Sequence, residues 1–153
     1  NDKIATKEAE RVSSETADIS VIEEELVDYL NEEGYRENIV KQLRIYKSGV
    51  QDYLTSTDAK EKLDAINNKI LPALDTLINE SIELDIKTTE IVKLNNLFIK
   101  EYHLRYVAYS ILAVNTENED IISTGNAYLN RADKVNEEYT EYYNEIIDEY
   151  RTS

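Results

Sequence analysis

The sequence of 153 residues is poor in the residues that bend, cross-link or coordinate. It has no cysteine, methionine or tryptophan, and it has one proline, one histidine and three glycines. Without cysteine there can be no disulfide, thiolate metal site or cysteine nucleophile. An all-β fold needs turn residues about every 8–12 positions, and this chain does not have them. These shortages favour long helices joined by short polar links.

Positive charge is scarce as well. The chain has 17 lysines and arginines against 32 aspartates and glutamates, and its net charge is −15. This balance disfavours nucleic-acid binding, which depends on cations that neutralise phosphates, and it disfavours binding to an anionic membrane surface. No apolar run reaches the roughly 18 residues of a membrane span. We therefore expect a folded acidic domain, whose charge leaves open a basic or cationic partner.

The clearest helical pattern lies near the C-terminus. Apolar or small residues recur there with alternating spacings of four and three, as in the seam of a coiled coil: Ile121, Gly125, Tyr128, Ala132, Val135, Tyr139, Tyr142 and Ile146. We predict a helix over 117–150, opened by a capping box of Thr116 and Glu119. Gly125 and Ala132 on the seam predict the close approach of a neighbouring helix.

The preceding segment, 89–114, is apolar over most of its circumference, which predicts a central helix buried by several neighbours. Thr88 or Thr89 is its expected N-cap. Another helix is predicted from Asp58 to Ile82. Pro72 lies inside that pattern, and it predicts either a kink near 68–72 or two shorter helices that meet there.

Two helices are predicted in the first third of the chain. Gly34 separates a first helix, with Ile19, Ile22, Leu26 and Leu30 on one face, from a second helix over 36–55, with a seam of Ile39, Leu43, Tyr46, Val50 and Tyr53. Short links make successive helices antiparallel neighbours. We therefore predict one domain over residues 1–153, an all-α, up-and-down antiparallel bundle of four to five long helices. Residues 1–17 either extend the first helix or fray.

No catalytic residue, metal site or cofactor is predicted. A di-metal carboxylate bundle needs two Glu-x-x-His pairs, whereas His103 is the single histidine and its nearest upstream acid is Glu101. The acidic segment 115–120 lacks the glycine and the closing glutamate of a calcium-binding loop. Metal-dependent enzymes are therefore disfavoured.

Six residues are candidates for binding: Glu101, Tyr102, His103, Arg105, Tyr106 and Tyr143. Glu101 and Arg105 have the spacing of an i,i+4 ion pair beside an apolar face. The pair either fixes helix register or forms the polar floor of a ligand cleft. The chain has twelve tyrosines and one phenylalanine, and an exposed patch of tyrosines and acids would suit a protein partner or a cationic amine.

Three stretches, 70–74, 94–102 and 138–145, resemble the helical domains of small predicted lipoproteins and secreted proteins of low-GC Gram-positive bacteria. The resemblance covers roughly residues 60–150. It implies an extracytoplasmic, cell-envelope compartment and a helical bundle, with no catalytic residues to transfer. The chain begins at Asn1 without an initiator methionine, so we expect a trimmed product. Any lipid anchor would lie upstream of Asn1.

The resulting hypothesis is a non-enzymatic, extracytoplasmic binding domain of a bacterial envelope protein that holds another protein or a small ligand. Two alternatives stay open. One is a cytoplasmic acidic protein of the immunity or inhibitor type that binds a basic partner. The other is the extracellular sensory domain of a membrane receptor.

Overall fold

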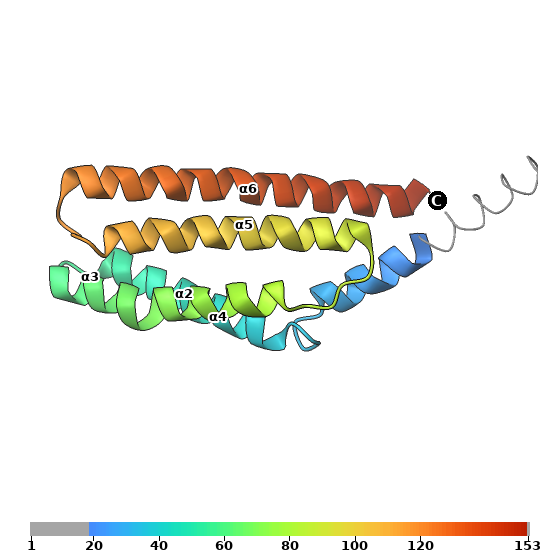
Figure 1. Cartoon of the computed structure of the whole chain (residues 1–153), viewed down its shortest axis with the longest axis horizontal. Coiled ribbons are helices and arrows are strands. Elements are labelled where there is room, and N and C mark those ends of the chain that lie inside the picture. Colours follow the sequence, from blue (N-terminus) through green and yellow to red (C-terminus); the bar gives the residue numbers. More distant parts are fainter. Residues whose placement is uncertain (1–18, 153) are drawn as a thin grey trace, which may run out of the picture.

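The computed structural model describes residues 19–152, with side chains as far as Glu149. Its elements are a first helix over 19–30, α2 (Glu37–Thr55), α3 (Ala59–Ala65), the π-helical turn η1 (Ile66–Ile70), α4 (Leu71–Ile82), α5 (Thr89–Leu112) and α6 (Glu119–Thr152) (Figure 1). No strand occurs in this part of the chain, and the predicted all-α bundle is confirmed. The prediction for residues 1–17 lies outside the described residues.

The helices run up and down the long axis of the bundle (Figure 1). The first helix and α2 form one pass, α3 to α4 return, and α5 and α6 complete the bundle. The link around Gly34 does not reverse the chain, so the expectation that every short link joins antiparallel neighbours is wrong there. Tyr29 of the first helix bonds Asn95 near the start of α5, and Tyr53 of α2 contacts Tyr109 near its end. The first helix and α2 therefore follow one another alongside α5.

The two long helices begin at polar caps. At α5, the Thr88 hydroxyl accepts a hydrogen bond from the Ile91 N–H at 3.4 Å, which confirms one of the two predicted caps. At α6, the carboxamide oxygen of Asn118 accepts from the Ile121 N–H at 3.0 Å. The predicted capping box at Thr116 is therefore wrong by two positions. An Asn side chain caps a helix as well as Thr does, so the geometry of the link decides between them.

Pro72 is accommodated by a change of helix type. The Leu71 N–H donates to the Ile66 carbonyl, five residues back, so η1 is one widened turn directly before the proline. Proline has no N–H, and its ring collides with the preceding turn of a regular helix. A π-turn spreads the carbonyls of that turn. The chain thus stays helical from Ala59 to Ile82, with its irregularity where Pro72 predicts one.

α5 and α6 pack against each other along most of their length. A Cβ atom added at Gly125 would lie 2.7 Å from the Leu112 side chain and 3.3 Å from the Ala108 carbonyl oxygen. Ala132 is completely buried against Leu104. The close approach predicted at Gly125 and Ala132 is confirmed, and we call this contact the α5–α6 seam.

The first helix is fastened to the beginning of α5 by a single carboxylate. Glu25 accepts hydrogen bonds from the backbone N–H groups of Lys87 and Thr88, both at 2.8 Å, and from the Thr88 hydroxyl at 2.6 Å. Ile22 and Leu26 pack beside it in a cluster with the end of α6. Within residues 19–152, no helix has the length and apolar character needed to cross a bilayer.

Candidate binding site

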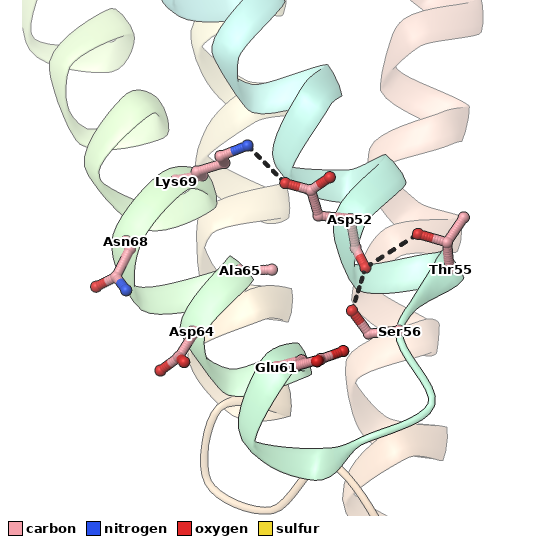
Figure 2. A pocket seen from close by; sticks show the side chains of 8 residues that line it. All are labelled: Asp52, Thr55, Ser56, Glu61, Asp64, Ala65, Asn68 and Lys69. Carbon is pink, nitrogen blue, oxygen red and sulfur yellow. Dashed lines mark hydrogen bonds and ion pairs between the residues drawn. The ribbon is translucent and has the colours of Figure 1, made fainter.

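The hollows in the described surface differ in how their charged side chains are satisfied. In one of them, beside the start of α5, Lys87 pairs with Asp85 at 2.9 Å. Two further hollows, the first and the second, lie beside α2. The first hollow, of about 350 Å³, lies where α2 ends and α3 begins (Figure 2). Its polar groups bond one another: the Lys69 ammonium pairs with Asp52 at 2.6 Å, and the Ser56 hydroxyl donates to the Asp52 carbonyl at 2.6 Å. Asp64 and Asn68 point away from Asp52. The one cation of this hollow, Lys69, is therefore already paired, and its other charged side chains, Glu61 and Asp64, are exposed acids.

The described residues contain no group of three or more His, Cys, Asp or Glu side chains placed to hold a metal ion.

The second hollow lies between α2 and α6, with α5 as its floor, and we call it the Arg36 groove. Its volume is about 270 Å³, which is close to the lower end of the range of about 300–1,000 Å³ for small-molecule sites. Apolar and aromatic side chains dominate its walls. It is lined by Leu30, Glu32, Arg36, Ile39, Val40, Leu43, Phe98, Glu101, Tyr102, Asn136 and Tyr139.

Arg36 occupies the turn between the first helix and α2, and it is only 7% exposed. Its guanidinium carbon lies 3.8 Å from the centroid of the Tyr29 ring and 4.9 Å from that of Phe98. Nη1 donates to the Tyr29 carbonyl oxygen at 3.0 Å, which closes the break between the two helices. Nε is buried and has no hydrogen-bond partner.

The carboxylates of the groove already have cationic partners. Glu101 is 3% exposed and accepts from Arg105 Nε and from the Asn136 amide, each at 2.9 Å. Arg105 also donates to Asp133 at 3.0 Å. The predicted Glu101–Arg105 pair is thus confirmed, and it extends onto α6.

Glu32, at the rim, pairs with Arg44 at 3.1 Å. No described carboxylate forms an ion pair with Arg36. The uncompensated charge of the groove is therefore positive, although the chain as a whole is acidic.

Two consecutive buried hydrogen bonds hold the Tyr29 ring, against which Arg36 packs. The Tyr29 hydroxyl donates to the side-chain Oδ1 of Asn95 at 3.0 Å, and the Asn95 side-chain Nδ2 donates to the Ser81 backbone carbonyl at 2.9 Å. Burial raises the pKa of Tyr29, while the positive charge of Arg36 acts in the opposite direction. Burial also raises the pKa of Tyr139, and the positive charge of Arg36 again opposes this increase. The charge of Arg36 thus acts on two tyrosines, Tyr29 of the first helix and Tyr139 of α6.

The structure brings together some of the predicted binding residues and separates others. Glu101 and Tyr102 line the groove, and Arg105 is bonded to Glu101. His103 is exposed and does not line it. Tyr106 is half-buried against the cluster between α2, α4 and α5, whereas Tyr143 is half-buried against the cluster of the first helix. Since these two tyrosines belong to different clusters and Tyr102 is buried, the predicted exposed patch does not form.

Arg36 is the residue that the sequence interpretation missed. It lies three residues before Ile39, so it continues the spacing of Ile39, Leu43 and Tyr46 back toward the N-terminus. This spacing could have predicted that Arg36 is buried. A charged residue is rarely buried without a partner, so its place on an apolar seam would have marked it as unusual.

Comparisons with protein-family models, with curated proteins and with solved structures give no match for this chain.

Proposed function

We propose that this chain is a non-enzymatic binding domain, that its ligand site is the Arg36 groove, and that it works outside the cytoplasm at a bacterial cell envelope. The observation that carries the proposal is a concave, largely apolar groove that holds a buried charge without a counter-charge. Ligand sites typically combine apolar walls with a few polar groups that set orientation.

A binding role fits the groove better than a catalytic one. Both oxygens of Glu101, its one buried acid, are already hydrogen-bonded. The eleven lining residues include no serine, threonine, cysteine, lysine or histidine, so they lack the side chains that most often serve as nucleophile or base. The envelope compartment rests on the resemblance to lipoprotein and secreted helical domains.

The groove is tested by a fragment screen that follows the amide signals of the ¹⁵N-labelled protein by NMR. We expect saturable shifts to concentrate on the lining residues of α2, α5 and α6, and Val40→Trp to abolish them by filling the groove. Ser48→Trp, at an exposed position of the same helix, is the matched control. Hits confined to the hollow of Figure 2, or the absence of hits, would disprove this site.

The compartment is tested separately. Antibodies against the domain should detect it in the surface or secreted fraction of the source cells, and protease added to intact cells should degrade the surface-bound protein. Recovery only from the protease-protected cytoplasmic fraction would favour the immunity-type alternative.

A further inference from the structure

We infer that the Arg36 groove binds a small organic monoanion, a carboxylate on an apolar body, with the Arg36 guanidinium as its recognition group. This inference rests on the proposed function, because it names the class of ligand for the same groove. It is carried by the only charge of the groove that no described residue compensates.

The first argument is charge. Burying a cation without a partner is costly, and a counter-ion or strong hydrogen bonds normally offset the cost. Glu101 and Glu32 are already neutralised by Arg105 and Arg44. One unmatched positive charge therefore remains, and a single negative charge on the ligand would balance it.

The second argument is the set of free donors. Nη1 of Arg36 is used by the Tyr29 carbonyl, while Nε and Nη2 form no hydrogen bond with any described residue. Guanidinium groups bind carboxylates through planar arrays of N–H donors, and such charge-assisted bonds are stronger than neutral ones. A carboxylate in the groove would accept a hydrogen bond from Nη2, which the fold leaves without a partner, whereas Nε is itself buried and closed to the groove.

The third argument is what surrounds the cation. Ile39, Val40 and Leu43 of α2 and Phe98 of α5 give the groove an apolar wall beside Arg36. The ligand should thus carry an aliphatic or aromatic part. A dianion such as a phosphate monoester fits less well, because the one unmatched positive charge of the groove would leave its second negative charge without a partner.

A purely structural role for Arg36 makes a different prediction. The rings of Tyr29 and Phe98 stabilise the cation, and the bond to the Tyr29 carbonyl holds the turn. If that were its whole role, replacing Arg36 would lower the stability of the fold, and no anion would bind at the groove.

The test is an NMR titration of the folded chain with four probes that share a six-carbon tail: hexanoate, hexanamide, hexylamine and hexyl phosphate. We expect hexanoate to shift the groove amides and the Arg36 Nε–Hε signal saturably, and to bind at least about tenfold more tightly than hexanamide. This comparison uses the unaltered protein, so it does not depend on a variant that folds.

Arg36→Gln should weaken hexanoate binding by about tenfold or more, since it removes a charge-assisted contact. Arg36→Lys, which keeps the charge, should retain part of it. Arg131→Gln, at an exposed α6 residue that does not line the groove, is the matched control and should change nothing.

Equal binding of hexanamide and hexanoate, undiminished hexanoate binding by Arg36→Gln, or no saturable hexanoate binding would overturn the inference. Tighter binding of hexyl phosphate or of hexylamine would overturn it too. If hexanamide binds as well as hexanoate, or if hexyl phosphate or hexylamine binds more tightly, the groove still binds a probe and the proposed function stands. A groove that binds no fragment of any charge would disprove both the inference and the proposed function.

Discussion

The two flanks of α5 are packed in opposite ways. On one flank, Gly125 and Ala132 are small enough for α6 to lie directly against the α5 backbone. On the other flank, α2 reaches α5 through aromatic rings: Tyr46 lies 5.9 Å from Tyr102 and 6.1 Å from Tyr109, centroid to centroid, in edge-on contacts. The backbone of α2 does not approach those of α5 and α6 as closely as these approach each other.

This difference explains where the groove lies. The distance between packed helices depends on the side chains at the contact. Small residues close the α5–α6 seam, whereas tyrosine rings hold α2 away from α5. The Arg36 groove is the opening that remains between α2 and α6, and Arg36, Glu101 and Asn136 are among the residues that line it. The same bundle therefore contains a close helix contact on one flank of α5 and an open groove on the other.

Alkaline pH should have the largest effect on the free energy of unfolding. The flank of α5 that packs through tyrosine rings, here called the tyrosine flank, should lose stability as those tyrosines ionise. Burial raises the pKa of Tyr46 to about 12 and raises the pKa of Tyr29, Tyr102 and Tyr109 further. The native state keeps protons that the unfolded chain releases above about pH 10. This stabilisation is complete below about pH 10 and is lost as the pH rises through the native pKa values.

Each such tyrosine should lower the free energy of unfolding by about 1.4 kcal/mol per pH unit above about pH 10, or roughly 5.5 kcal/mol per pH unit for the four together. The measurement is urea unfolding at increasing pH, followed by circular dichroism and tyrosinate absorbance. Tyr46→Phe should reduce the slope by about a quarter. Tyr142→Phe, at a tyrosine whose pKa burial raises less, should reduce it less. Equal slopes for both variants would show that the tyrosine flank is not the sensitive one.

Glu101→Ala should have the next largest effect on stability, because the buried Glu101 of α5 is hydrogen-bonded to Asn136 of α6. The substitution leaves Arg105, 15% exposed, with Asp133 as its remaining acidic partner, and it removes the bond to Asn136. We expect a loss of about 3 kcal/mol in the free energy of unfolding, measured by urea denaturation. The exposed Glu138→Ala is the control.

Replacing both members of the pair, Glu101→Met with Arg105→Met, should restore stability to within about 1 kcal/mol of the unaltered chain. If the double variant were as unstable as Glu101→Ala, the cost would lie in packing rather than in an unpaired buried charge.

Gly125→Val tests the other flank and should cost about 2 kcal/mol. Its Cβ would lie 2.7 Å from the Leu112 side chain, which is fully buried and has no room to move. Asn126→Val introduces the same side chain at the adjacent exposed position of α6 and separates helix propensity from overpacking. Equal urea midpoints for the two variants would mean that the seam is looser than the structure indicates.

The seam was predictable from the sequence to a much greater degree than the groove. Helical spacing is local information, so all eight seam positions from Ile121 to Ile146 could be identified, and each is buried or half-buried. The groove depends on where three elements meet. Arg36 keeps the spacing of its seam, but its charge conceals it from a search for apolar residues, and only the tertiary structure shows that it is buried without an acidic partner.

The links show the same limit on a smaller scale. Asn115, Thr116 and Asn118 are all residues that favour turns and caps. The Asn115 carboxamide oxygen accepts from the Glu117 N–H at 2.9 Å, and this local turn delays the start of α6 until Asn118 can cap it. Pro72 likewise predicted where the helix is irregular, but it did not predict that the irregularity is a π-turn.

The smallest expected effect is at Glu25, and it tests whether the first helix, whose end forms part of the groove, can detach while the α5–α6 seam stays intact. Glu25→Gln keeps the shape of the side chain but weakens its three charge-assisted bonds to Lys87 and Thr88. We expect a loss of about 1 kcal/mol that is confined to the docking of residues 19–30. Native-state hydrogen exchange should therefore show lower protection in the first helix and unchanged protection in α5 and α6. Glu24→Gln, at the exposed neighbouring position, is the control. An equal loss of protection along α6 would show that the first helix and the seam unfold as one unit, and the difference between the two flanks would then be one of geometry without a difference in local stability.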